Sequence, residues 1–506
     1  MVPLAELSQE EIDQIVESVP GGQSNIQDIY ALSLLQESIF FHHLSLQDDD
    51  PYVSRVLLGL PNRALVEQLV AALNYSIARH DALHTAVKWN KLRSPVQVVL
   101  GEAVLQSNEI DFQIENGDIA TQLQEFCLQE RYHFDVREAP LLRLFTAQDK
   151  CNDRWIVLIL EHHLALDHIS LALLVDEVKA KLLGKPIYQP APVAYRNHIG
   201  HLQLKAKDQE HGSFFDRLLA DVDNSTLPYE LSEIRGSQNL GEATLLLENN
   251  LSQALRDTAR AYRVSPASLF HLAYGQMVGR LSNQENVVFG TVLLGRSAGW
   301  EGVERVVGML MNTLPLYVSI GKLSVEAALR QTHKTLTDLV GHEQTDLGLI
   351  QRTSKVTPLF SALFNYRHRA DETGISVMDS LPLGIEVLKI QERTNYPFSM
   401  SVDDWSTGFL LTAQVRDGID PTRVCGYLMQ TLKEVVNALR ERPHTSMLSL
   451  PFLSAEERDQ LLTKYNKTDH TYSASSRIES LSKNKPRARR TDMRFNSAIS
   501  TSLTTN

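Results

Sequence analysis

Residues 155–160 (WIVLIL) form an uninterrupted apolar run, and this run constrains the fold more than any other segment. It is short enough to be a strand, and a strand without polar positions has to be covered on both faces. After a polar turn, apolar residues recur at helical spacing from Leu171 to Leu182. A buried strand followed by an amphipathic helix predicts a sheet that is covered by helices.

The same alternation runs through the rest of the chain. In the first half we predict helices at residues 7–19 and from Asn62, which is a suitable N-cap, and a strand at 95–100. In the second half we predict helices that begin at Ser252 and Ser265 and helices at 324–342 and 421–440, with strands at 287–294, 358–366 and 409–415. Strands and helices interleave in both halves, so the predicted class is α/β or α+β with two lobes.

The length of 506 residues exceeds what one hydrophobic core supports, so we expect two or three lobes. A proline-rich stretch, with Pro186, Pro190 and Pro192, predicts the boundary between them. We expect a leader helix in residues 1–24, an N-terminal lobe in 25–190 and a C-terminal lobe in 191–455. A linker in 456–472 and a disordered, basic tail in 473–506 complete the predicted organisation.

Charge and composition exclude several classes of protein. The net charge of −12 argues against a nucleic-acid groove, which needs a basic surface. Three scattered cysteines exclude a disulfide scaffold and a zinc ribbon. No apolar stretch reaches the roughly 18 residues of a membrane span, and the acidic N-terminus is not a signal peptide. We therefore expect a cytoplasmic protein with neither nucleic-acid nor membrane partners.

The segment 161–168 (EHHLALDH) is the strongest candidate for a chemical site. It lies where the buried strand ends and the amphipathic helix begins, and such strand ends open into crevices. A histidine there titrates near neutral pH and can accept a proton from an attacking amine or hydroxyl.

The motif alone leaves three other interpretations open. The histidines and Asp167 can simply cap the helix. His163 and His168 can be zinc ligands, although the spacing is not that of HExxH and no further ligands complete the shell. His162 with Asp167 also fits the HxxxxD pattern of glycerolipid acyltransferases, which work at membranes, whereas this chain shows no anchor.

Together with its neighbours, the segment resembles the condensation domains of non-ribosomal peptide synthetases, whose core motif is HHxxxDG. Further segments resemble the family's motifs in the family's order and cover about residues 25 to 465: DIYALSLLQE at 28–37, RHDALHT at 79–85, VFGTVLLGR at 288–296, NTLP at 312–315, PLF at 358–360 and NYPF at 395–398. KYNKT at 464–468 resembles the linker that leads into an adenylation domain. This ordered set is more specific than any one motif.

The resemblance implies two chloramphenicol-acetyltransferase-like lobes in a V-shaped arrangement with a central tunnel. Upstream and downstream carrier proteins would deliver acyl and aminoacyl thioesters on phosphopantetheine arms, with no bound cofactor or metal. His163 would deprotonate or position the acceptor amine, supported by His162, Asp167 and His168. A floor loop would include Gly290, Thr291, Gly295, Arg296 and Asn312, and residues 395–412 would supply a latch.

Three positions depart from the family pattern. His168 replaces the usual glycine, and His84 stands where an arginine commonly offers a partner to the motif aspartate, so that Asp167 would rely on His84, Arg79 or another donor. The HxxxPF motif is altered around His342. The departures at His84 and His168 keep open a non-catalytic interface that recruits tailoring enzymes. An epimerisation domain, which shares the HHxxxDG motif, is a third alternative.

The sequence contains no adenylation motifs and no carrier segment with a serine for phosphopantetheine. Adenylation domains of neighbouring modules would therefore have to activate the substrates. We expect either a truncated module or a stand-alone condensation protein.

Overall fold

The computed structural model describes residues 3–45, 50–112, 117–129, 134–186, 191–205, 210–232, 240–297, 299–321, 323–369, 381–405 and 407–468. The chain divides into two compact units, Met1–Phe452 and Leu453–Asn506. In the second unit a short helix, α13 (Ala455–Asp459), is followed by a π-helical turn at Gln460–Lys464. Residues 187–190, at the predicted lobe boundary, and the predicted tail at 473–506 lie outside the described residues.

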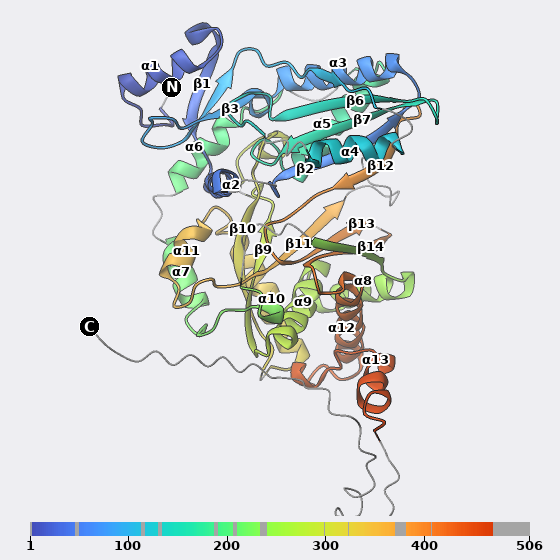
Figure 1. The fold of residues 1–506 in the computed structure, drawn as a ribbon. Coiled ribbons are helices and arrows are strands. Elements are labelled where there is room, and N and C mark those ends of the chain that lie inside the picture. The colour runs from blue at the N-terminus through green and yellow to red at the C-terminus, as the bar shows by residue number, and fades with distance from the viewer. Residues whose placement is uncertain are drawn as a thin grey trace, which may run out of the picture. The chain divides into compact units, whose positions relative to one another are not determined.

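A five-stranded sheet in the first unit contains the apolar run (Figure 1). Its strand order is β12 (Glu386–Gln391), β2 (Val53–Leu60), β7 (Arg154–His162), β6 (Leu142–Asp149) and β5 (Ser107–Glu109). Strand β7 is central, and Ile156, Val157 and Leu158 are fully buried, which confirms the predicted strand. Strands β2 and β6 flank it antiparallel, and β5 adds parallel to β6.

Helices cover this sheet. Helices α3 (Arg63–Arg79) and α5 (His168–Leu182) pack on each other, with α3 against β2 and β7, while α4 (Ile119–Gln129) packs on β6 and β7. The predicted cap is confirmed, because Asn62 Oδ1 accepts a hydrogen bond from the backbone N–H of Leu65 at 2.9 Å. Helix α1 (Gln9–Ser18) precedes a separate three-stranded sheet of β1 (Ile26–Ala31), β4 (Val96–Leu100) and β3 (Thr85–Lys88).

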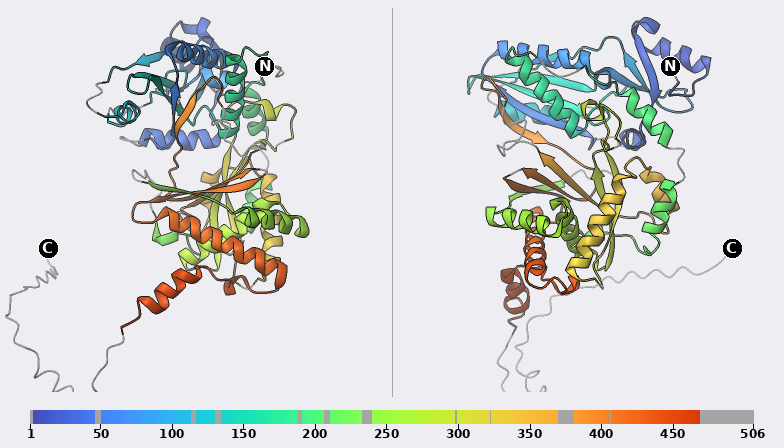
Figure 2. Two further views of the ribbon diagram at one scale, coloured as in Figure 1. Left: turned by 90° about the vertical axis from the view of Figure 1, so that its right-hand side faces the viewer. Right: turned by 180° about the vertical axis from the view of Figure 1, so that it is seen from behind.

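The second half forms a six-stranded sheet. Its order is β10 (Asn312–Ser319), β9 (Asn286–Leu293), β11 (Ala362–Arg369), β13 (Phe398–Trp405), β14 (Gly408–Arg416) and β8 (Leu240–Leu246). Strand β11 runs parallel to both of its neighbours, and the other pairs are antiparallel. Figure 2 shows helices on one side of this sheet, namely α8 (Asn249–Tyr262), α9 (Pro266–Ser282), α10 (Val325–Val340) and α12 (Pro421–Glu441).

The predicted caps of two of these helices are confirmed. Ser265 and Ser324 each accept a backbone N–H of the first turn, and Pro266 occupies the first position of α9. Four more α-helices lie in the described part of the first unit: α2 (Leu34–Ser45), α6 (Arg196–Lys205), α7 (Glu210–Leu218) and α11 (Leu347–Thr353). Among the described residues, no helix combines the length and the apolar character that crossing a membrane requires.

Two predicted boundaries are wrong. Ser252 does not begin a helix, because α8 starts at Asn249 and Ser252 is buried in its first turn. The strand predicted at 358–366 starts only at Ala362. The residues before it pair with Thr226 instead, since the Thr226 N–H donates to Leu359 and the Ser361 N–H donates to Thr226.

Candidate functional site

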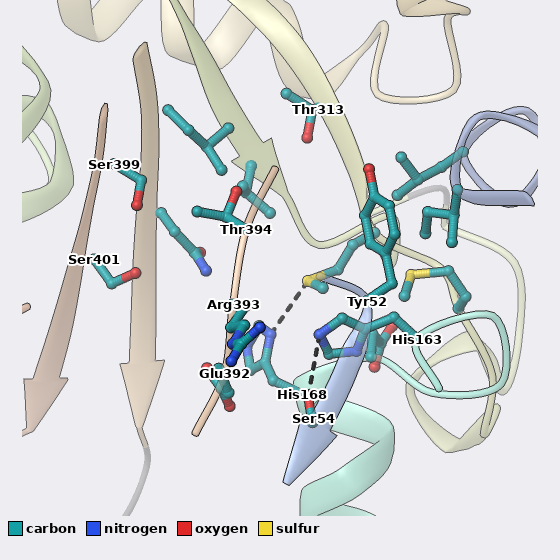
Figure 3. Close-up of a pocket in the computed structure, with 18 of the residues that line it drawn as sticks. Tyr52, Ser54, His163, His168, Thr313, Glu392, Arg393, Thr394, Ser399 and Ser401 are labelled. Carbon is teal, nitrogen blue, oxygen red and sulfur yellow. Dashed lines mark hydrogen bonds between the residues drawn. The ribbon is translucent and has the colours of Figure 1, made fainter. Parts of the chain in front are cut away.

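A cavity of about 1170 Å³ in the first unit is lined by both halves of the sequence. Tyr52, Ser54 and His163 line it from the five-stranded sheet and the turn after β7, and Thr313 and Ser399 line it from the six-stranded sheet (Figure 3). The lining combines apolar side chains with polar and charged ones, and a concave space of this size is typical of a ligand site. The predicted catalytic residue His163 therefore lies in the wall of a cavity.

The ring of His163 is held between two elements. It follows β7 directly, and its backbone N–H donates to the carbonyl of Tyr52 at 2.9 Å. Its Nε2 lies 3.3 Å from Ser54 Oγ (Figure 3), and its Nδ1 is buried, 3.7 Å from Glu161 Oε1. The side chain keeps 24% of its surface accessible. With Nδ1 buried, Nε2 is the ring nitrogen that a molecule in the cavity can reach.

Nearby carboxylates control the charge of this ring. Burial lowers the pKa of His163, but Glu161 and then Glu392 outweigh it and raise that pKa to about 9. Burial also raises the pKa of Glu392, whereas Arg367 and His163 lower it to about 2. At pH 7 the ring is therefore mainly protonated, since this pH lies below its raised pKa.

His162 has a different environment from His163. It is fully buried, its Nδ1 accepts the Leu164 N–H at 3.1 Å, and its Nε2 lies 3.0 Å from Asp50 Oδ2. The same Asp50 oxygen lies 2.6 Å from Nδ1 of His43. Because Nδ1 of His162 is an acceptor, Nε2 carries the proton and donates a hydrogen bond to Asp50. His162 thus anchors the end of β7 and does not line the cavity.

Asp167 fixes the start of α5. Its side chain is fully buried and accepts backbone N–H groups of Ser170 at 2.7 Å and Leu310 at 3.1 Å. Arg296 Nη2 donates to both carboxylate oxygens, at 2.9 and 3.0 Å. The prediction that His84 or Arg79 serves Asp167 is therefore wrong, and the alternative of another donor is confirmed.

The two rejected partners are engaged elsewhere. His84 Nδ1 contacts the carbonyl oxygen of Leu100, and Arg79 pairs with Glu177 at 3.0 Å. The cation that pairs with Asp167 is instead Arg296, which lies in the loop between β9 and β10. The departure at His84 hence leaves Asp167 with a full cation, and it carries no argument for a non-catalytic domain.

The loop between β9 and β10 packs into the first half. Val307 and Met309 belong to the same hydrophobic core as β2 and β7, and Tyr195 Oη donates to the Met309 carbonyl at 2.6 Å. Gly295 has a φ of +67°, and a Cβ there would lie 1.7 Å from the carbonyl oxygen of Leu310. A glycine is therefore required where the loop turns.

The remaining predicted residues lie around this loop. Asn312 lines the cavity, and its Nδ2 donates to the carbonyls of Glu343 and Thr345 at 2.9 and 2.8 Å. Gly290 and Thr291 lie in β9 outside the cavity lining. A Cβ on Gly290 would approach Phe360 to 2.7 Å. Thr291 Oγ1 instead lies 2.8 Å from His271 on α9, so its side chain faces the helix layer.

His168 is the first residue of α5 and lines the cavity. Its Nδ1 lies 3.2 Å from Met311 Sδ (Figure 3). His168 also lowers the pKa of Glu392, by less than Arg367 and His163 do, against the opposing effect of burial. The ring at this position thus occupies cavity wall that a glycine would leave open.

Residues 395–412, which we predict to supply a latch, are not the segment that joins the two sheets. Those residues form β13, β14 and the turn before them, inside the six-stranded sheet. The strand that joins the other sheet is β12, Glu386–Gln391, which pairs antiparallel with β2 (Figure 1). Its side chains are only partly buried, so no apolar run marks it in the sequence.

Among the described residues, His43, Asp50 and His162 are the group whose ligand atoms lie close enough to share an ion. Their mutual hydrogen bonds already explain that proximity. His163 and His168, the zinc ligands considered from the sequence, gain no third ligand in this part of the chain.

The sequence profile described as Condensation domain matches residues 26–462. The chain belongs to this family. The resemblance inferred from the motifs is thereby confirmed, and with it a condensation domain of non-ribosomal peptide synthetase type. The motif histidine in the cavity wall is His163.

The condensation domain is similar to parts of much larger synthetases. It is 39% identical over 494 residues to malpibaldin synthetase of Mortierella alpina, which covers 97% of this chain and 9% of the synthetase. It is 42% identical over 478 residues to malpinin synthetase of the same organism, which covers 93% of this chain and 6% of the synthetase. The chain thus spans less than a tenth of the length of these two relatives.

Two solved structures share the fold. The condensation domain from the monacolin K polyketide synthase MokA has a TM-score of 0.64 at 16% identity, over 84% of this chain and 100% of that one. The first condensation domain of the calcium-dependent antibiotic synthetase, in complex with a substrate analogue, has a TM-score of 0.66 at 14% identity, over 85% and 100%. The predicted α/β class with a chloramphenicol-acetyltransferase-like fold is confirmed, and the V-shaped arrangement stays a prediction.

Sequence reasoning missed three contributors to the site. Asp50 ends an acidic stretch that resembles a solvated loop, yet its side chain is buried against His43 and His162. Ser54 and Glu392 carry no motif. Successive side chains of β2 point to opposite faces, but the strand is buried at nearly every position, so no periodicity in its sequence identifies Ser54.

Proposed function

We propose that this condensation domain forms an amide bond between two carrier-bound substrates. The donor is an acyl thioester and the acceptor an aminoacyl thioester, each on a phosphopantetheine arm of a carrier protein. Adenylation domains of neighbouring modules would load those carriers. The observation that carries the proposal is the position of His163, whose Nε2 faces a cavity lined from both halves of the domain.

The chemistry needs one nucleophilic attack and one leaving group. The acceptor nitrogen attacks the donor carbonyl carbon, a C–N bond forms, and the C–S bond breaks as the sulfur leaves as a thiolate. The proton that the nitrogen loses passes to the thiolate or to a base. His163 Nε2 can contact these atoms once a substrate displaces Ser54 Oγ, which lies 3.3 Å away.

The charge of His163 separates two roles for the ring. A protonated ring, the main form at pH 7, donates a hydrogen bond to the developing oxyanion or gives a proton to the leaving sulfur. A neutral ring accepts the proton of the amine, and its share grows as the pH rises towards 9. The first role predicts a rate that falls above pH 9, and the second a rate that rises up to it. Holding both substrates in place supplies a further part of the rate.

The test is a single-turnover assay with loaded donor and acceptor carriers, followed by mass spectrometry of the acceptor. We expect wild type to form the amide, and His163→Ala to be slower by about a hundredfold or more. His444→Ala is the matched control, because the side chain of His444 is 86% exposed and lies outside the cavity lining. Equal rates for His163→Ala and wild type, or no amide from wild type, would contradict the proposal.

A further inference from the structure

The two ring nitrogens of His163 contact residues that face each other across one strand pair. Ser54 on β2 is directly opposite Glu161 on β7 in the antiparallel register. Side chains at opposite positions of such a pair lie on the same face of the sheet. Both Ser54 and Glu161 line the cavity, with Ser54 at Nε2 of His163 and Glu161 at Nδ1. The sheet therefore holds the imidazole ring from both sides.

Glu161 is buried without a complete set of hydrogen bonds. Its side chain is 7% exposed, and its Oε1 is buried and accepts no hydrogen bond. The basic atom that faces this oxygen is Nδ1 of His163, 3.7 Å away, which is also buried and has no hydrogen-bond partner within 3.5 Å. The backbone of Leu166 also favours the protonated ring, with a smaller effect on its pKa than Glu161 has. A buried carboxylate is costly unless a positive group is beside it. Glu161 Oε1 and His163 Nδ1 are thus placed to pair with each other.

We propose that Glu161 is a positioning residue that keeps a proton on Nδ1 of His163 and so commits Nε2 to the substrates. A proton held on Nδ1 fixes the tautomer of the neutral ring and leaves the Nε2 lone pair free. In the protonated ring the same contact stabilises the positive charge. The inference rests on the proposed function for its catalytic meaning, but the charge interaction itself can be measured without a substrate.

Other charged groups around His163 are already engaged. Glu392, which follows β12, is paired with Arg367 of β11 at 2.7 Å, and Asp50 is shared by His43 and His162. His168, at the start of α5, is a further titratable ring in the same wall. Of the two carboxylates that raise the pKa of His163, Glu161 has the larger effect. Removal of Glu161 should hence move the titration of His163 more than removal of Glu392.

The direct experiment is a titration of His163 by NMR, with ¹³C-labelled histidine and no substrate, in wild type and in Glu161→Gln. His163→Gln identifies the signal. We expect the midpoint to fall by about one to two pH units in Glu161→Gln, the size of a close carboxylate–cation effect. Glu37→Gln is the matched control, since Glu37 also lines the cavity but does not act on His163, and it should leave the midpoint in place.

Glu161→Asp keeps the charge on a shorter side chain, so the midpoint of its His163 titration should lie between those of wild type and Glu161→Gln. Glu161→Asp serves as the test if Glu161→Gln does not fold. A Glu161→Gln or Glu161→Asp domain that folds and titrates like wild type overturns the inference. The pH–rate profile of amide formation is the second readout, and its inflection should move down with the NMR midpoint. A shifted midpoint in a wild-type domain that makes no amide would overturn the proposed function and leave the ion pair standing.

Discussion

The ion pair between Arg296 and Asp167 ties the loop after β9 to the start of α5, and its removal gives the most quantitative prediction. In Arg296→Met the side chain keeps its apolar volume and loses its charge. The Arg296 and Asp167 side chains are 8% and 0% exposed, so the carboxylate would stay buried without its cation. Breaking a buried pair in this way costs about 3–5 kcal/mol.

The cost should lie at the lower end of that range, because Asp167 keeps the N–H groups of Ser170 and Leu310. About 450 residues unfolding with about 2.1 cal/mol/K each give an unfolding entropy near 0.9 kcal/mol/K, so about 3 kcal/mol lowers Tm by about 3 °C. Thermal unfolding followed by circular dichroism measures it. Asp167→Asn removes the carboxylate charge that Arg296→Met leaves without a cation. The double variant Arg296→Met/Asp167→Asn should therefore lose less stability than the sum of the losses of the two single variants. A Tm of Arg296→Met within about 1 °C of wild type, or stability losses of the two single variants that simply add in the double variant, would show that this ion pair does not stabilise the domain.

Three further predictions concern single positions. Gly295→Ala should lower the stability of the domain by about 1–3 kcal/mol, because its Cβ would collide with the Leu310 carbonyl; Gly299→Ala, also at positive φ but with open space around the Cβ, is the control and should lose less in thermal unfolding. Asp50→Asn should destabilise the domain at pH 7. Burial raises the pKa of Asp50, but His162 and His43 outweigh burial and hold that pKa below 3.8. The decrease in Tm of Asp50→Asn relative to wild type should therefore become smaller as the pH falls below 3.8. His163→Gln should remove the stability that comes from the raised pKa of His163, which wild type has in full below pH 6.5 and loses as the pH rises towards 9. The difference in Tm between wild type and His163→Gln should therefore narrow over that interval. A constant difference would contradict the raised pKa of His163.

Local signals predicted the elements that surround the site. The run at 155–160 is apolar because β7 is central and covered on both faces, and Asn62, Ser265 and Ser324 cap helices with side chains made for that geometry. The order of motifs predicted the family. These features depend on residues close in sequence, so the sequence alone contains them.

Features that depend on distant contacts were missed. Strand β13 contains two buried acidic residues, Asp403 and Asp404. The strand tolerates them because Arg367 and Arg256 pair with these carboxylates. Its sequence therefore does not show the apolar signal of a central strand. The partner of Asp167 was sought at the position that the motif suggests, whereas a loop 129 residues away provides it. Ion pairs of this kind are set by topology and not by spacing.

If a substrate's pantetheine arm reaches Ser54 and His163 inside the cavity, site-directed alkylation will detect it there. A haloacetyl-pantetheine would be offered to Ser54→Cys in a Cys151→Ser background, since Cys151 is exposed while Cys127 and Cys425 are buried. We predict one added pantetheine at position 54, found by peptide mass spectrometry, and none there in the background protein. Ser54→Cys that folds like wild type and is labelled no faster than the background protein would contradict the account.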